Sequence, residues 1–161
     1  MQRDRYVEEL KQYLAIPSIS ALPEHQGDVR RAAEWSADQM RAIGLENVRL
    51  IETPGHPIVY GEWLNAPGAP TVLFYGHYDV QPVDPLELWE SPPFAATVRE
   101  GELYARGAAD DKGQVFMHFK AIEAHMTQTG RLPLNIKVFL EGEEEVGSLH
   151  LDQFVRESRP L

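Results

Sequence analysis

TVLFYGHYDV, residues 71–80, is an apolar run that ends abruptly in a glycine, a histidine and an acid. Residues 71–75 are mostly β-branched or aromatic, and such a run predicts a strand. This strand would carry His77 to the carboxyl end of a sheet, which is where α/β proteins build their sites. We therefore expect the chemistry of the protein to lie at His77 and its neighbours.

Helical and strand patterns alternate on either side of this run. Apolar residues at helical spacing predict helices, and turn residues separate the shorter β-rich runs. Helices are predicted at 3–15, from about 27 to a left-handed cap at Gly44, at 113–128 and at 149–156, and strands at 48–51, 58–63, 71–75 and 134–140. This alternation predicts an α/β fold, an open mixed sheet flanked by helices. Residues 82–101 are predicted to be a long loop, a kind of segment that often carries function.

Two later segments carry the acids that a metal site needs. They are YARGAADDKG, residues 104–113, and LEGEEEVGS, residues 140–148. Each follows a probable strand or extended stretch, so the loops of an open sheet could bring them to the same edge as His77. One ring nitrogen and several carboxylates form a ligand set that binds zinc or a similar divalent ion for hydrolysis.

The residue types suggest a division of roles. His77 would give a ring nitrogen to one ion, and Asp79 could fix the imidazole tautomer through the other ring nitrogen. Asp110 suits a bridge, because a carboxylate can give one oxygen to each of two ions about 3.5 to 4 Å apart. Within the acidic run, one glutamate would bind the second ion and its neighbour would stay free as a general base.

Length and composition limit the other classes of function. A chain of 161 residues is long enough for one domain with a substantial core and too short for two ordinary domains. The formal net charge of −10 argues against a nucleic-acid partner, because phosphate-binding surfaces normally have a basic patch. No cysteine is present, so disulfides and thiolate sites are excluded. Residues 1–20 contain no continuous hydrophobic stretch, so we expect no signal peptide, no membrane partner and a cytoplasmic location.

Taken together, the three segments resemble the M20 family of zinc peptidases. The resemblance spans most of the chain, and GHYDVQP (76–82), WESPPF (89–94) and GELYARGAADDKG (101–113) look most like the dipeptidase branch of the carnosinase type. It implies a zinc-peptidase-like catalytic domain and a metal-dependent hydrolase that cleaves the amide bond of dipeptides or small N-acyl amino acids. It also implies that full-length relatives form homodimers through a lid domain.

The resemblance implies a role for each matching residue. His77 would bind one of two zinc ions, Asp110 would bridge the two, and Glu145 would bind the other. Glu144 would be the catalytic base, and Asp79 would orient His77. Manganese or cobalt could replace zinc, since oxygen-rich sites accept several ions.

Two further details come from the same resemblance. The register within the glutamates follows from aligning EEVGS, residues 144–148, with the paired glutamates that precede Gly-Ser in the family. The peptide bond between Asp110 and Asp111 is often cis in relatives.

The chain also departs from the family pattern. In relatives, a further carboxylate ligand, a lid and dimerisation domain and a distal histidine ligand follow the glutamate pair, and residues 146–161 contain none of them. We therefore expect residues 1–161 to be the N-terminal portion of a truncated catalytic domain. The alternative is a non-catalytic fragment or subunit with an incomplete metal site that needs a complementary chain.

Several other polar residues are expected to have no part in the site. Glu141 and Glu143 fit a solvated face or a helix entry. His118 and His125 do not stand at strand ends and are expected to be structural or exposed, as are His25, His56 and His150. Trp35, Trp63 and Trp89 are predicted to be packing residues, although Trp89 lies in the long loop and could line a cleft.

Overall fold

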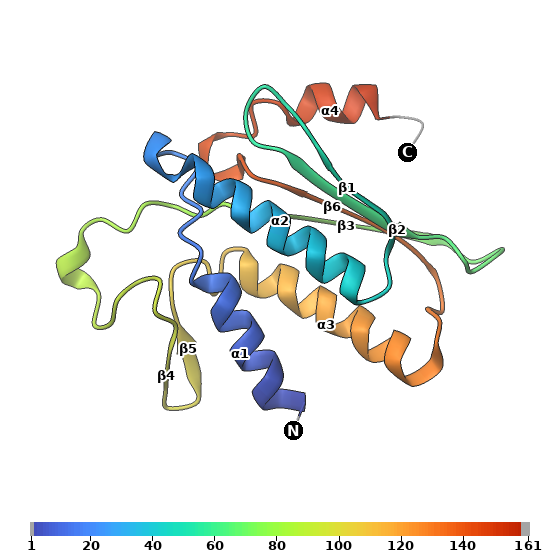
Figure 1. The fold of residues 1–161 in the computed structure, drawn as a ribbon, viewed down its shortest axis with the longest axis horizontal. Helices are drawn as coiled ribbons and strands as arrows, with labels where there is room; N and C mark the ends of the chain where they lie inside the picture. Colours follow the sequence, from blue (N-terminus) through green and yellow to red (C-terminus); the bar gives the residue numbers. More distant parts are fainter. Residues whose placement is uncertain (1, 159–161) are drawn as a thin grey trace.

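A four-stranded sheet lies at the centre of the computed structural model, which describes residues 2–158 (Figure 1). The strands are β1 (Glu46–Ile51), β2 (Ile58–Trp63), β3 (Thr71–His77) and β6 (Asn135–Glu141). Their order across the sheet is β1-β2-β6-β3. β2 runs antiparallel to β1 and to β6, whereas β3 runs parallel to β6. The predicted open mixed sheet is therefore confirmed.

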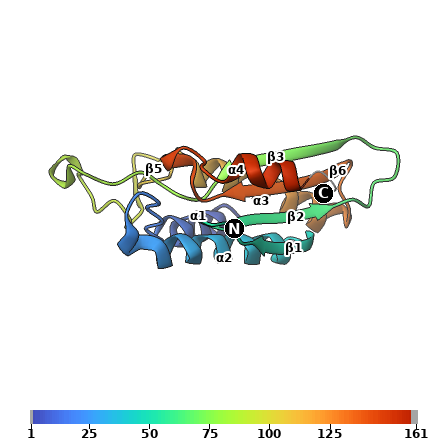
Figure 2. The ribbon, with the colours of Figure 1, turned by 90° about the horizontal axis from the view of Figure 1, so that it is seen from above.

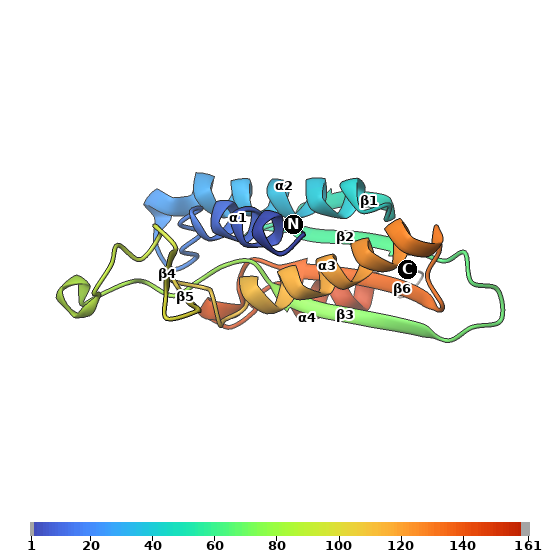
Figure 3. The same cartoon turned by 90° about the horizontal axis from the view of Figure 1, so that it is seen from below.

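Helices cover both faces of this sheet. α1 (Gln2–Leu14), α2 (Gln26–Ala42) and α3 (Lys112–Thr129) lie on one face, and the short α4 (Leu151–Glu157) lies on the other (Figures 1 and 2). Figure 3 looks onto the face with three helices, where α1 contacts α3 and stacks Tyr13 on Trp35 of α2. Within residues 2–158, no helix combines the length and apolar character needed to cross a membrane.

The core lies between the sheet and the larger helical layer. Val138 and Leu140 of β6, Met40 of α2 and Phe119 of α3 are among the buried residues that contact one another there. Inward residues alternate along β6, as expected for a strand with one face on the core. One face of β6 is therefore buried in the core.

Shorter elements occupy the connections. β4 (Thr97–Arg99), near the end of the long loop, forms a hairpin with β5 (Glu102–Tyr104), and 3-10 turns lie at Pro23–His25, Leu86–Leu88 and Glu144–Val146. The predicted loop over residues 82–101 is present, and β4 is part of it.

The predicted helices and strands are all present, with ends that differ by one or two residues. Gly44 has the expected left-handed conformation, with φ of 91°. The shift that matters most is in β3, which continues to His77 instead of ending at Tyr75. It does so because its last residues pair with the end of β6, with His77 opposite Glu141. The carboxyl ends of β3 and β6 and the first turn of α3 therefore lie at one end of the molecule (Figure 1).

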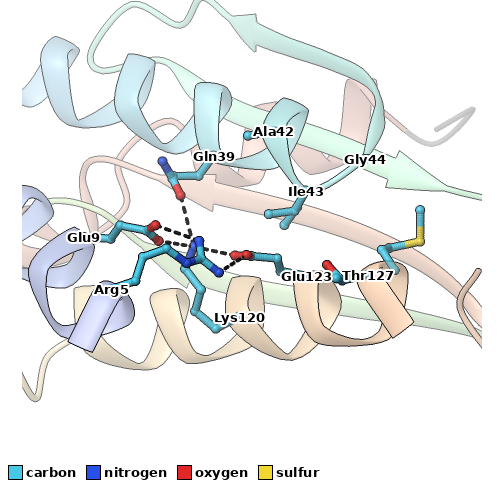
Figure 4. Close-up of a pocket in the computed structure, with 10 residues that line it drawn as sticks. Arg5, Glu9, Gln39, Ala42, Ile43, Gly44, Lys120, Glu123 and Thr127 are labelled. Carbon is cyan, nitrogen blue, oxygen red and sulfur yellow. Dashed lines mark hydrogen bonds and ion pairs between the residues drawn. The ribbon is translucent and has the colours of Figure 1, made fainter. Parts of the chain in front are cut away.

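Charged side chains join α1 to α3 beside a hollow of about 470 Å³ (Figure 4). Arg5 pairs with Glu9 and Glu123, and Nζ of Lys120 lies 2.5 Å from Oε2 of Glu9 and 2.7 Å from Oε2 of Glu123. Every one of these charges has an opposite partner within the group. None of the metal or catalytic residues predicted from the sequence lines this hollow, so we assign the group to helix packing.

Candidate metal centre

His77 is the last residue of β3, and its side chain is 7% exposed. The preceding glycine is needed there, because a Cβ on Gly76 would lie 2.6 Å from Oδ2 of Asp111. That oxygen accepts a hydrogen bond from the backbone N–H of His77 at 3.2 Å. Gly76 thus lets Asp111 approach the end of the strand and fix the backbone of His77.

Asp79 is fully buried beside the imidazole. Nδ1 of His77 lies 3.1 Å from the backbone oxygen of Asp79 and 3.3 Å from its Oδ1. The same carboxylate accepts hydrogen bonds from the backbone N–H groups of Glu144 at 3.3 Å and Glu145 at 3.1 Å, and from the Ser20 hydroxyl at 2.6 Å. Asp79 therefore connects the imidazole to the backbone of the glutamate pair.

Asp110 reaches the site from the loop between β5 and α3. This loop contains Gly107, with φ of 79°, and its Asp110–Asp111 peptide bond is cis, as the family resemblance implies. Oδ1 of Asp110 lies 3.1 Å from Nε2 of His77. The Asp110 side chain is 75% exposed, so its carboxylate is open to solvent while it contacts the buried imidazole.

Glu144 and Glu145 stand on the 3-10 turn that follows β6. Oε2 of Glu144 lies 3.9 Å from Nε2 of His77, and its side chain is 44% exposed. Oε2 of Glu145 accepts a hydrogen bond from Nε2 of Gln81 at 2.6 Å. The two carboxylates therefore have different neighbours, although they are adjacent in the chain.

Within the described part of the chain, one group of side chains could hold a metal ion. His77, Asp110 and Glu145 offer ligand atoms that all lie within 4.8 Å of one another. One imidazole nitrogen and two carboxylates suit zinc, manganese or cobalt. The residues thus fit the divalent ion that the sequence predicts, and Glu144 lies next to the group without belonging to it.

The charges around His77 also favour a cation. Burial lowers the pKa of His77, but the hydrogen bond and charge of Asp79, together with the charges of Asp111 and Glu144, outweigh burial and raise this pKa to about 9. The excess of negative charge that holds a proton on the ring would also attract a metal ion. Metal binding would displace that proton, because a ligating imidazole must be neutral.

The structure contradicts a solvated face for Glu141 and Glu143, whereas Glu143 does stand at a helix entry, as the N-cap residue of the 3-10 turn. They are 1% and 7% exposed, so neither belongs to a solvated face. Oε2 of Glu143 pairs with Nδ1 of His150 at 2.8 Å. Glu141 accepts hydrogen bonds from the hydroxyls of Tyr75 and Ser148. Glu143 also lies close against Gly55, where an added Cβ would be 1.9 Å from its Oε1.

The remaining histidines and Trp89 have other contacts. The His118 ring packs on Phe74 with centroids 4.5 Å apart, and Nδ1 of His25 lies 2.6 Å from Asp28. In the part of the chain that the structure describes, the metal-ligand group includes none of His25, His56, His118, His125 and His150. Trp89 donates its indole N–H to the Val83 oxygen at 2.9 Å and also lines a hollow of about 490 Å³ that reaches the residues just before Asp110.

Sequence reasoning missed Ser20. An isolated bridge between Ile19 and Val80 places it beside Asp79, although the two residues are 59 positions apart. The backbone N–H of Val80 donates to the Ser18 oxygen at 2.9 Å and supports the same pairing. No local pattern around residues 18–20 indicates this contact, because it depends on which backbone segment lies alongside residue 80.

Comparison with known proteins gives the same assignment over nearly the whole chain. A family model described as peptidase family M20/M25/M40 matches residues 73–160. The chain is 34% identical to the Beta-Ala-His dipeptidase of Rattus norvegicus, over 99% of this chain and 35% of that protein. It is 37% identical to the Cys-Gly metallodipeptidase DUG1 of Candida albicans, over 95% of this chain and 34% of that protein.

A solved structure agrees with these relatives. The crystal structure of human carnosine dipeptidase 1 superposes with a TM-score of 0.90 at 34% identity and covers 96% of this chain and 35% of that one. The chain thus spans about a third of the length of the relatives that it matches.

Proposed function

We propose that this chain, which belongs to the M20/M25/M40 peptidase family, carries part of the site of a metal-dependent dipeptidase. The single observation that carries the proposal is the convergence of His77, Asp110 and Glu145 within 4.8 Å at the carboxyl end of the sheet. His77 ends β3, Asp110 lies in the loop before α3 and Glu145 lies on the 3-10 turn after β6, and each belongs to one of the three segments that the sequence analysis selects. In the proposal, His77 and Glu145 would hold different ions of a zinc pair, and Asp110 would be a ligand shared by both.

The side chains have separate tasks in this proposal. Bound divalent ions supply Lewis acidity, which lowers the pKa of water and polarises the carbonyl of the scissile bond. Glu144 takes a proton from the attacking water and later gives it to the leaving amine, as a general acid–base should. Its place at the edge of the ligand group, with Oε2 3.9 Å from Nε2 of His77, supports this role. Asp79 keeps Nε2 directed to the site by engaging Nδ1.

The names of the relatives support the substrate class that we propose. Two of them are named as dipeptidases for Beta-Ala-His and for Cys-Gly, so we propose dipeptides as substrates, with small N-acyl amino acids as the wider class. We also propose that the chain corresponds to the N-terminal portion of an M20 catalytic domain, and that a lid domain outside it mediates homodimerisation. Zinc is the proposed metal, and manganese or cobalt would suit the same donors.

Zinc titration by calorimetry tests the metal centre. We expect weak binding by the chain, because three protein ligands shared between two ions leave both coordination shells incomplete. His77→Ala should lower the affinity by roughly 100-fold or more, since losing a ligand costs at least as much as losing a group that orients one. His125→Ala on α3 is the matched control and should bind as the wild type does. Binding that is unaffected by His77→Ala would remove the proposed site.

The alternative function is a non-catalytic fragment or subunit that needs a complementary chain. It is favoured by the ligand count, because the described residues gather three ligands where two ions require more. A panel of dipeptides and N-acyl amino acids, tested with zinc-loaded chain, separates the two functions. We expect little or no turnover by the chain alone, because positioning groups supply much of the barrier reduction. Turnover of about 1 to 1,000 per second by a monomer would contradict the alternative.

A further inference from the structure

Glu141 is a buried carboxylate whose position links the sheet to the glutamate pair. It is the last residue of β6, it stands opposite His77 in the parallel pair, and it is 1% exposed. Its backbone oxygen accepts a hydrogen bond from Tyr78 N–H at 2.9 Å. Burying a carboxylate costs free energy unless hydrogen bonds compensate for the lost water, so the partners of Glu141 are needed to keep it buried.

Both side-chain partners of Glu141 donate to the same oxygen. The Tyr75 hydroxyl donates to Oε1 at 2.5 Å and the Ser148 hydroxyl donates to Oε1 at 2.9 Å. Tyr75 belongs to β3, and its ring packs on Phe139 of the neighbouring β6 with centroids 5.1 Å apart. Ser148 belongs to the loop that carries Glu144 and Glu145. Glu141 therefore ties a residue of this loop to the rigid end of β3.

Two buried carboxylates hold the loop 142–148 at different points. Asp79 accepts the backbone N–H groups of Glu144 and Glu145 at the start of the 3-10 turn. Glu141 accepts the hydroxyl of Ser148 just after the turn. Ser148 has φ of 52°, and its N–H donates to the Glu143 oxygen at 2.7 Å, so the backbone at this point reverses. The turn that presents the Glu145 carboxylate is thus held on both sides.

We propose that Glu141 is a positioning residue that, with Tyr75 and Ser148, fixes the turn carrying Glu144 and Glu145 against His77 and Asp110. The inference rests on the proposed function, because it assigns Glu141 to the geometry of that metal centre. Glu141 touches neither metal nor substrate in this role. It acts through Ser148, and the distance between the Glu145 and His77 ligand atoms depends on it.

The first experiment measures amide hydrogen exchange by NMR in the metal-free chain. Ser148→Ala removes one hydrogen bond to Glu141 and should speed exchange of the Glu144 and Glu145 amides about fivefold to tenfold, the factor that one hydrogen bond supplies. Ser36→Ala is the matched control. Ser36 is a fully buried serine of α2 whose hydroxyl bonds Tyr13 and Ala32. Removing this hydroxyl should leave the exchange rates of the Glu144 and Glu145 amides within about twofold of wild type.

A second pair of variants removes the other partner of Glu141. Tyr75→Phe keeps the ring and loses the hydroxyl, and it should also speed exchange of the Glu144 and Glu145 amides. Tyr60→Phe is its control, because the Tyr60 hydroxyl bonds Glu62 elsewhere in the sheet. Neither substitution adds volume or leaves a large cavity, so the fold should survive both.

Zinc affinity then separates positioning from simple stabilisation. Ser148→Ala and Tyr75→Phe should weaken zinc binding roughly tenfold, the lower end of the loss caused by removing groups that orient ligands. The two controls should bind like wild type even if their melting temperatures fall. If these two variants sped exchange of the Glu144 and Glu145 amides without changing zinc affinity, the positioning role would be overturned. It would also be overturned if neither exchange nor zinc affinity changed. If the wild-type chain binds no zinc, the proposed metal function fails, and the exchange measurement still decides whether Glu141 fixes the turn.

Discussion

Glu144→Gln should lower turnover by roughly 10²- to 10⁴-fold in an active form of the protein, the usual contribution of a general acid–base. The substitution keeps the shape of the side chain and removes the group that accepts a proton. Metal content should stay nearly unchanged, because Glu144 lies beside the ligand group His77, Asp110 and Glu145 rather than in it. Steady-state kinetics together with metal analysis of the purified variant measures both quantities.

Glu145→Gln is the matched comparison for this prediction. The two glutamates are adjacent, are both held by Asp79 through their backbone N–H groups, and differ in what their carboxylates approach. Glu145→Gln should lose metal as well as activity, because it removes a ligand charge. If Glu144→Gln emptied a metal position while Glu145→Gln retained its metal, the assignment of base and ligand would be reversed.

Gly113→Ala should lower the free energy of unfolding by on the order of 3 kcal/mol, the upper range for forcing atoms into a packed site. Gly113 is the second residue of α3, and a Cβ there would lie 2.1 Å from the backbone oxygen of Ala108. A backbone atom cannot move aside as a flexible side chain can, so the loop from Gly107 to Asp111 would have to shift. Zinc binding should weaken with it, because Asp110 belongs to that loop.

Gly27→Ala provides the control for Gly113→Ala. Gly27 is the second residue of α2, and apart from its chain neighbours and the backbone of its own helix, no atom would lie within 4 Å of its new Cβ. The change should alter stability by no more than about 1 kcal/mol, in the direction of stabilisation, because alanine favours helix. Urea unfolding followed by circular dichroism compares the two variants directly. Equal stability of both variants would contradict the close packing of Gly113 on Ala108.

Much of the fold could be predicted because its signals are local. The β-rich run 71–75 and the helical spacing after Gly113 depend on neighbouring residues only, and both elements are present where expected. Their ends were less accurate. β3 continues to His77 because β6 lies beside it, and a partner strand is not visible in the sequence of residues 71–80.

The candidate site was also predictable only in part. His77, Asp110 and Glu145 could be selected from motif and family resemblance, and the structure brings their ligand atoms together, while their roles as ligands stay predictions. The sequence predicts a solvated face or a helix entry for Glu141, and the structure buries this residue at the end of β6. An acidic run has the same composition whether water or a folded loop surrounds it, so burial could not be read from it.

The sequence by itself determined which residues are candidates for the site. It also determined the spacing of apolar residues that marks each segment as helix or strand, because side-chain type and spacing are properties of neighbouring residues. Only the tertiary structure decided that Ser20 meets Asp79 and that Tyr75 and Ser148 meet at Glu141. These contacts depend on the parallel pairing of β3 with β6 and on the bridge between Ile19 and Val80. Such pairings join segments far apart in the chain, and they form because the whole core must pack at once.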